Sequence, residues 1–342
     1  MNPPETIDTL VLLADPNLYD DTKEEGIFNE ENFESVKKLK ETLSKIPGFS
    51  FRYLDHHEKM IETLLMHPPQ LVLNFCDTGY KNKAHLELNV PAFLEMLDLP
   101  YSGASPLGMV YCYDKALVRL VANDLGIPVP KEIFLPPHKE IEQVDMDFPL
   151  LLKPNFGDGS VGITKDAVVN NLKDIKTHIR FIRSLRPHTP ILLQEFLCGR
   201  EFSVGLIGNP SRDFHELPIL EVDYSTLPSE FPAILSFESK AVPHSPYYDE
   251  IKYQRAELSK ENQRFLIQSS KMLFERLFCQ DYGRFDFRMD RKGQMKLLEV
   301  NPNPAWSFLG KLALMTEFSG HDSMTMFKWI LNAASKRLNL NN

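Results

Sequence analysis

The feature that most constrains the fold is an alternation of polar and apolar residues near the C-terminus. Residues 282–290 read Tyr-Gly-Arg-Phe-Asp-Phe-Arg-Met-Asp, and residues 296–304 read Lys-Leu-Leu-Glu-Val-Asn-Pro-Asn-Pro. Side chains alternate across a strand, so Arg284, Asp286 and Arg288 share one face while the apolar residues between them face a core. Asp290, which ends the first run, and the Arg-Lys-Gly that follows it are typical of a turn, which predicts an antiparallel hairpin.

This hairpin predicts a metal site. It brings Glu299 and Asn301, two residues apart on one face of the second strand, beside Asp286. Two carboxylates and an amide form a set of oxygen donors, which suits Mg²⁺ completed by water and phosphate oxygens. The alternative is a solvated hairpin with an exposed salt bridge, which is common on protein surfaces.

A second informative segment predicts a phosphate site. Residues 148–153 form an apolar strand that ends in Lys153, and Gly157, Gly159 and Gly162 follow. Glycines allow a backbone to approach phosphate oxygens closely. The three glycines also fit a dinucleotide-binding turn, but that motif requires a helix to open within them, whereas residues 163–165 read as a returning strand. Lys153 at the strand end favours a triphosphate.

The remaining pattern predicts an α/β chain. Strands are expected at residues 10–13, 51–54 and 71–75, with helices at 33–46 and 85–97 between and after them, as in a Rossmann-like lobe with a parallel sheet. Asp114 is a good N-cap for a helix that ends near Gly126. Further helices are expected at 167–185 and 260–278 and after Gly320, and further strands at 191–196 and 201–207.

Length, charge and cysteine content limit the number of domains, the partners and the location that are expected. A chain of 342 residues suits two or three domains. The net charge of -9 argues against nucleic-acid or anionic-membrane partners. Without a signal-peptide pattern at the start or an apolar run of membrane-spanning length, a cytoplasmic protein is expected. Four widely spaced cysteines indicate neither zinc nor disulfides, and we expect buried thiols.

The two segments, in this order, resemble the ATP-grasp superfamily, specifically its D-alanine–D-alanine ligase branch, and residues 85–105 followed by Asp114 and Lys115 resemble the family's lead-in to its central domain. The resemblance implies an α/β, ATP-grasp fold. A Rossmann-like domain (1–105) would precede a central α+β subdomain with the glycine loop (106–190) and a C-terminal α+β subdomain with the metal site (191–342). ATP would be clamped between the last two.

The resemblance also implies a role for individual residues. Arg284 and Lys240 match the catalytic cations, and Asp286, Glu299 and Asn301 match the ligands of Mg²⁺, or of Mn²⁺ in its place. A loop at about 224–253 would carry Lys240 as a lid. The residues that match nucleotide-binding positions are Lys115, Lys153, Gly157, Gly159, Ser160, Gly162, Gln194, Glu195, Leu197 and Glu201.

The departures from the family concern the substrate. Residues 14–19 replace the family's glycine-rich, His-containing turn, and Gly159-Ser160 replaces a serine pair. The run at residues 302–311, Pro-Asn-Pro-Ala-Trp-Ser-Phe-Leu-Gly-Lys, differs from the family's tail, which offers a serine to the acceptor carboxylate. The resemblance therefore implies an ADP-forming carboxylate–amine ligase acting on another amino acid, peptide or carboxylate. A true D-alanine–D-alanine ligase, an ATP-grasp kinase and a nucleotide-binding module without catalysis are the alternatives. A homodimer is left open.

Overall fold

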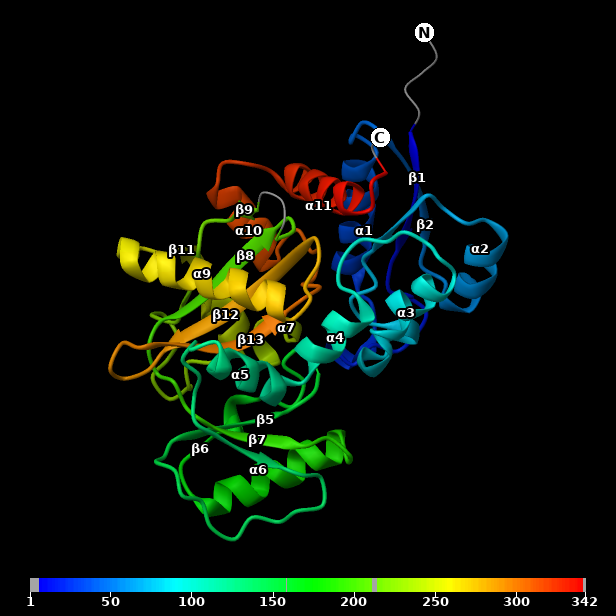
Figure 1. Cartoon of the computed structure of the whole chain (residues 1–342). Coiled ribbons are helices and arrows are strands. Elements are labelled where there is room, and N and C mark those ends of the chain that lie inside the picture. The colour runs from blue at the N-terminus through cyan, green and yellow to red at the C-terminus, as the bar shows by residue number, and fades with distance from the viewer. Residues whose placement is uncertain (1–5, 158, 211–213, 341–342) are drawn as a thin grey trace.

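Three sheets organise the chain in a computed structural model that describes residues 6–157, 159–210 and 214–340. Figure 1 shows them as three lobes around a common centre, with the N-terminal lobe to one side and the central lobe below the C-terminal one. Asp158 of the glycine loop lies outside the described residues. Within them, no helix is both long and apolar enough to cross a membrane.

The N-terminal lobe is the expected parallel sheet. Its strands β1 (Ile7–Leu12), β2 (Phe49–Leu54) and β3 (Leu71–Asn74) run in the order β2-β1-β3. Side chains of β1 alternate between two cores, so Leu10 and Leu12 pack on one face while Val11 packs on the other. The helices of this lobe are α1 (Glu30–Leu43), α2 (Met60–Met66) and α3 (Asn89–Met96), and the last covers only the second half of the expected helix.

The central sheet is antiparallel, in the order β4-β7-β5-β6. Helix α6 covers one face, where Ile175, Ile179 and Ile182 pack against Leu150 and Leu152. Its elements are β4 (Glu132–Leu135), β5 (Leu150–Pro154), β6 (Val168–Val169), α6 (Leu172–Leu185) and β7 (Ile191–Glu195).

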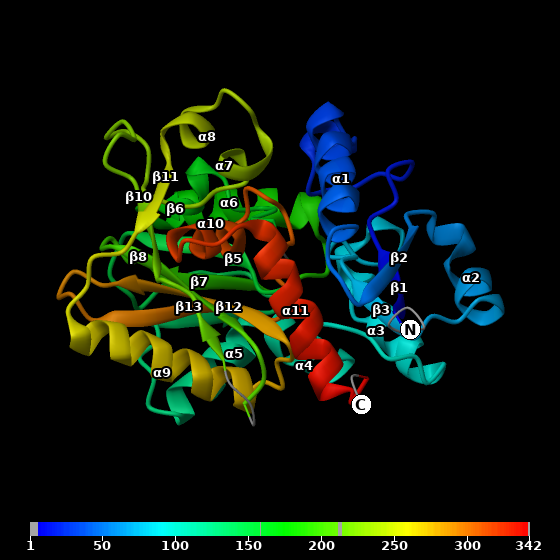
Figure 2. The same ribbon diagram turned by 90° about the horizontal axis from the view of Figure 1, so that it is seen from above.

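The C-terminal sheet runs β11-β10-β8-β12-β13, with β9 paired to β8. Figure 2 shows it with α9 along one face and α10 and α11 on the other, so that α11 lies between this sheet and α1. Helices α4 and α5, which connect the lobes, pack beside α9. The elements are α4 (Pro106–Tyr113), α5 (Lys115–Asp124), β8 (Glu201–Ile207), β9 (His215–Glu216), β10 (Leu220–Asp223), α7 (Glu238–Ala241), α8 (Pro246–Glu250), β11 (Lys252–Arg255), α9 (Lys260–Arg276), β12 (Tyr282–Met289), β13 (Met295–Asn301), α10 (Lys311–Phe318) and α11 (Ser323–Arg337).

Three expectations from the pattern are wrong. Residues 163–165 are not a returning strand, because positive φ at Gly159, Ser160 and Gly162 turns the backbone, and Ile163 N donates to the Ser160 carbonyl instead. Helix α6 begins at Leu172 rather than 167, because Asn171 caps it by accepting from Asp174 N. Cys198 is exposed, whereas the other three cysteines are buried.

The domain limits remain a proposal. Strand β7 pairs with β4 and β5, so its ladder belongs to the central sheet. Helix α5 packs through Val118 and Ala122 into the core beneath the C-terminal sheet. We therefore propose a boundary after Glu195 rather than after residue 190, with α4 and α5 as a connection that packs on the C-terminal subdomain.

Candidate active site

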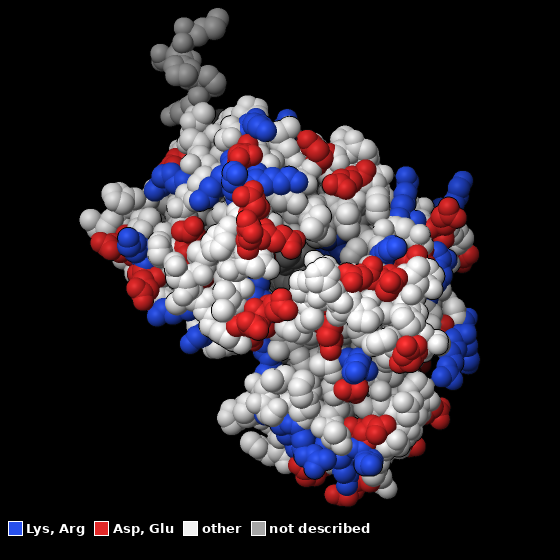
Figure 3. Space-filling view, turned by 180° about the vertical axis from the view of Figure 1, so that it is seen from behind, with Lys and Arg blue, Asp and Glu red and all other residues white. Residues whose placement is uncertain are grey.

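The three lobes meet at a cleft of about 670 Å³. Its walls come from strands of the central and C-terminal sheets and from connections and helices of all three lobes. Figure 3 shows a hollow where the lobes meet on the far side of the molecule, with acidic side chains around it and basic groups within. A cleft of this size, with converging charged groups, is the default binding site of an enzyme.

The hairpin forms as its turn residues predict. Asp290 accepts hydrogen bonds through its carboxylate from Lys292 N (2.8 Å) and Gln294 N (3.0 Å), and Gly293 has a φ of 80°. In the ladder Asp286 is paired with Glu299, and Arg284 with Asn301, while a bulge follows Asp286. The polar face of the hairpin therefore opens to the cleft and the Phe residues enter the core.

Asp286 is held by several donors. Ser203 Oγ donates to its Oδ1 (2.5 Å), Arg284 donates through Nε and a terminal nitrogen (3.0 to 3.1 Å), and Asn301 Nδ2 lies 3.2 Å from Oδ2. Lys311 Nζ lies 3.6 Å from Oδ1. Burial favours the neutral acid, but the charges of Arg284 and Lys311 hold the pKa of Asp286 well below its ordinary value.

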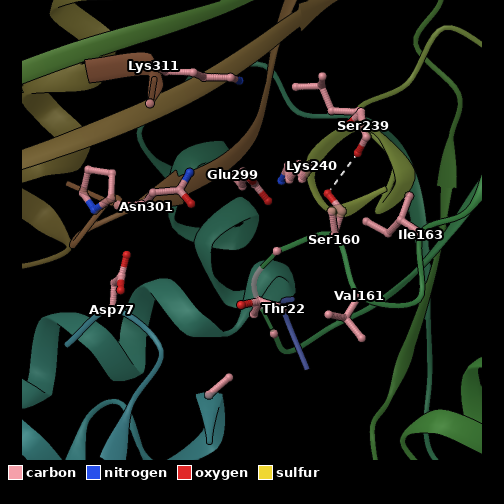
Figure 4. Close-up of a pocket in the computed structure, with 18 of the residues that line it drawn as sticks. Thr22, Asp77, Ser160, Val161, Ile163, Ser239, Lys240, Glu299, Asn301 and Lys311 are labelled. Carbon is pink, nitrogen blue, oxygen red and sulfur yellow. Dashed lines mark hydrogen bonds between the residues drawn. The ribbon is translucent and has the colours of Figure 1, made fainter. Parts of the chain in front are cut away.

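Glu299 is in a different environment. Among the described residues, no hydrogen bond or ion pair engages its carboxylate oxygens, although Lys115, Lys153 and Lys240 surround it. Burial opposes ionisation, yet these ammonium groups keep the pKa of Glu299 below its ordinary value. Figure 4 shows Glu299 and Lys240 pointing toward each other at the centre of the cleft, with Asn301 and Lys311 on one side.

The lysines around Glu299 come from separate elements. Lys115 begins α5, whose cap is the Asp114 carboxylate as expected, and its Nζ donates to the Gly157 carbonyl (2.5 Å). Lys153 is the penultimate residue of β5, and burial together with the like charge of Arg119 lowers its pKa to about 7. The Lys240 side chain is exposed to the cleft, but the surrounding protein shields it from bulk water, and this desolvation lowers its pKa to about 8.

The glycine loop connects all three lobes. A Cβ on Gly159 would lie 3.2 Å from Thr22 of the N-terminal lobe. Ser160 Oγ donates to the Leu235 carbonyl (2.9 Å), and Phe237 N donates to the Ile163 carbonyl (2.8 Å), so the segment carrying Lys240 is docked on the loop. Figure 4 shows Ser160 facing this segment, with Thr22 nearby.

Four sequence-predicted residues lie apart from the cleft lining. Gly162 accepts from His178 through its carbonyl, Leu197 is buried, and Glu195 is paired with Lys296 (2.9 Å). The fully buried Gln194 donates to Glu132, and its Oε1 has no partner within the described part of the chain. Glu201 does line the cleft, where it accepts from Arg288 (3.2 Å) and Tyr224 (2.8 Å).

Several site residues escaped the sequence pattern. Ser203 and Lys311 approach Asp286 from β8 and from the start of α10, a helix that the sequence did not predict. Arg119 lies beneath Lys153, where it pairs with Glu132 and donates to the Leu298 carbonyl. Asn155 supports α5 by accepting from Ala116 N (2.9 Å). The sequence marked Lys311 only as the end of the run at residues 302–311, with no role attached to it.

The oxygen donors of the hairpin suit a divalent cation. Among the described residues no cluster of three or more His, Cys, Asp and Glu side chains forms a metal site. Asp286, Glu299 and the Asn301 amide nevertheless form an oxygen set at one end of the ladder, and the Glu299 carboxylate is open to the cleft. The orientation of the Asn301 amide is assigned from its hydrogen bond, so its oxygen can also face the cleft. The set fits Mg²⁺.

Comparison with known proteins agrees with this geometry. The family model "D-ala D-ala ligase C-terminus" matches residues 121–332. The chain belongs to this family of ATP-dependent ligases. Among curated relatives, it is 30% identical to the uncharacterized protein y4sG of Sinorhizobium fredii over 73% of this chain and 70% of that one. It is 26% identical to a D-alanine–D-alanine ligase of Aquifex aeolicus, over 71% and 76% of the two chains.

Solved structures confirm the fold of this family member. It superposes on a D-alanine–D-alanine ligase of Bacillus anthracis complexed with ATP with a TM-score of 0.73, at 17% identity, covering 98% of this chain and 100% of that one. The VanG D-Ala:D-Ser ligase of Enterococcus faecalis gives a TM-score of 0.70 at 16% identity, covering 96% and 100%. The ATP-grasp fold expected from the sequence is thereby confirmed.

Proposed function

We propose that the chain is an ATP- and Mg²⁺-dependent carboxylate–amine ligase that forms an amide through an acyl phosphate, with a substrate pair other than two D-alanines. One observation carries the proposal: Lys115, Lys153, Lys240 and Arg284 converge with Asp286 and Glu299 in a single cleft. Such a set suits transfer of a phosphoryl group, where catalysis depends on positioning and charge compensation.

The chain's own residues can place ATP. Lys153 and Lys115 lie at the glycine loop, where they would contact the phosphates. We assign the β7–β8 connection, with Glu201, to the nucleoside by family likeness. Asp286, Glu299 and Asn301 would hold Mg²⁺, which supplies charge neutralisation for the phosphate oxygens.

Arg284 and Lys240 serve the reaction itself. A carboxylate oxygen of the acyl donor forms a bond to the γ-phosphorus as the bond to the β-phosphate oxygen breaks, which releases ADP. The amine then attacks the acyl carbon, phosphate leaves, and the amine proton passes to solvent. Arg284 and Lys240 face the same cleft and offset the charge that redistributes in both steps. The segment docked on the glycine loop excludes water from the acyl phosphate.

The N-terminal wall of the cleft favours an amine-bearing substrate. Glu24, Glu31, Asp77 and Glu87 line this wall together with Lys23. A net negative wall attracts ammonium groups and repels an acceptor with additional negative charge. Residues 14–19 do not line the cleft, since Asp15 is buried and accepts from His57 N (2.9 Å). This segment therefore offers no substitute for the substrate-binding turn that the sequence lacks.

The test is a phosphate-release screen of the purified chain with ATP and Mg²⁺ against pairs of amino acids, short peptides and simple carboxylates. The proposal predicts release that requires both a carboxylate and an amine. Release that depends on one hydroxyl-bearing substrate alone, with a stable phosphorylated product, would establish a kinase instead.

A further inference from the structure

We propose that the Lys311 ammonium group is a built-in positive charge of the metal site, so that this ligase works with one divalent cation per ATP. The inference rests on the proposed function and adds to it the number of metal ions and the residue that sets this number. Paired carboxylates in phosphoryl-transfer sites are otherwise able to hold two metal ions a few ångströms apart.

The two carboxylates of the site are not equivalent. Both oxygens of Asp286 already accept from protein donors, which are the Ser203 hydroxyl, the Arg284 guanidinium and the Asn301 amide. Glu299 has no such donors within the described residues and faces the cleft. One metal ion can therefore bind Glu299 together with Asn301 and Asp286 Oδ2 once the Asn301 amide turns its oxygen to the cleft, whereas a second ion at Asp286 Oδ1 would have to displace the Ser203 hydroxyl.

The Lys311 ammonium group lies where a second metal ion at Asp286 Oδ1 would bind. The Lys311 side chain is only 10% exposed, and its Nζ donates to Ser203 Oγ (2.9 Å) while lying 3.6 Å from Asp286 Oδ1. Ser203 is fully buried and in turn donates to the same Oδ1. A divalent ion on Oδ1 would lie a few ångströms from this ammonium group, where repulsion between like charges is strong because the site is largely shielded from water.

The charge balance immediately around Asp286 and Glu299 agrees with one ion. Five cationic side chains face Asp286 and Glu299, and they are Lys115, Lys153, Lys240, Arg284 and Lys311. ATP brings about four negative charges and the acyl donor brings one more. A single divalent cation makes the total close to neutral, whereas a second one would leave about two uncompensated positive charges. Without Lys311 the balance favours more metal.

The experiment is a Mn²⁺ titration of the full chain with a non-hydrolysable ATP analogue, in which electron paramagnetic resonance counts bound Mn²⁺. We expect one nucleotide-dependent Mn²⁺ in the wild type. Lys311→Met keeps the apolar stem and removes the charge, so we expect a second ion to bind at least tenfold more tightly than any second ion in the wild type. Lys311→Arg, which keeps the charge, should retain one. Lys292→Met, in the exposed hairpin turn, is the matched control and should also retain one.

Two tightly bound Mn²⁺ ions in the wild type would overturn the inference. Because this count is made on the wild type, it tests the inference even if Lys311→Met does not fold. An unchanged single ion in a folded Lys311→Met would overturn it as well, because another group would then exclude the second ion. Absence of any nucleotide-dependent Mn²⁺ from the wild type would instead remove the proposed function on which the inference rests.

Discussion

Asp286 and Glu299 are direct partners across the β12–β13 ladder, yet one carboxylate is saturated by protein donors and the other is open to the cleft. The difference follows from their neighbours. Asp286 lies between β8 and Arg284, which supply donors, whereas Glu299 faces ammonium groups that do not contact it closely. Protein hydrogen bonds therefore hold the Asp286 carboxylate in place, whereas the Glu299 carboxylate is free of them within the described part of the chain and can bind a metal ion.

Glu299→Gln is expected to reduce turnover by about 10²- to 10³-fold, because one charge-organising group is lost at nearly constant shape. Folding should be almost unaffected. The measurement compares phosphate release with the thermal midpoint, alongside Lys292→Gln in the turn, which should match the wild type in both. Near-normal turnover with unaltered Mg²⁺ dependence would show that the hairpin is structural.

Lys153→Ala is expected to weaken ATP binding strongly, because Lys153 lies near the end of β5, shortly before the glycine loop, and lines the cleft. Titration calorimetry of the variant against the wild type measures the loss. An unchanged affinity would show that the phosphates lie elsewhere.

ATP affinity should fall as the pH rises above about 7. The pKa of Lys153 is lowered to about 7 in the free protein, and bound phosphates favour its protonated form. Below pH 7 Lys153 is already protonated in the free protein, so its contribution to ATP affinity does not change with pH. Above pH 7 ATP binding must also take up a proton, and the affinity then decreases by up to about tenfold for each pH unit. Calorimetry at pH 8 in buffers of different ionisation enthalpy should detect this proton uptake, and it should be smaller in Lys153→Ala.

The chain is expected to be a poor D-alanine–D-alanine ligase. The substrate-binding turn is absent from residues 14–19, and Gly310-Lys311 stands near the end of the segment where the family offers a serine. Product analysis with millimolar D-alanine and ATP checks this. Robust formation of the dipeptide would refute the substrate assignment and leave the ATP site untouched.

Arg119→Met should destabilise the fold by about 3–5 kcal/mol, because it leaves Glu132 and the Leu298 carbonyl without their buried partner. Urea unfolding provides the measurement. Arg183→Met breaks a pair with the exposed Glu140 and serves as the control, with an expected cost below about 1 kcal/mol. Equal losses in the two variants would contradict the role of Arg119 as a buried ion-pair partner.

The sequence predicted the hairpin and the α5 cap because each depends on local rules. Alternation places Asp286 and Phe285 on opposite faces, Gly293 permits the turn, and Asp114 caps the helix that follows it. These features need no knowledge of distant residues.

The sequence pattern did not predict contacts between residues that are far apart in the chain. Ser203, Lys311 and Asp286 meet only because β8 pairs with β12 and α10 packs over the sheet. Local propensity indicates an extended chain at residues 163–165, but positive φ angles just before them, at Gly159, Ser160 and Gly162, turn the backbone instead.

The most direct test of the ligase assignment uses the substrate pair found by the release screen, with ¹⁸O in the carboxylate of the acyl donor. An acyl-phosphate route predicts transfer of one ¹⁸O atom into the released phosphate for every amide formed. Phosphate without ¹⁸O, alongside normal amide formation, would contradict the account.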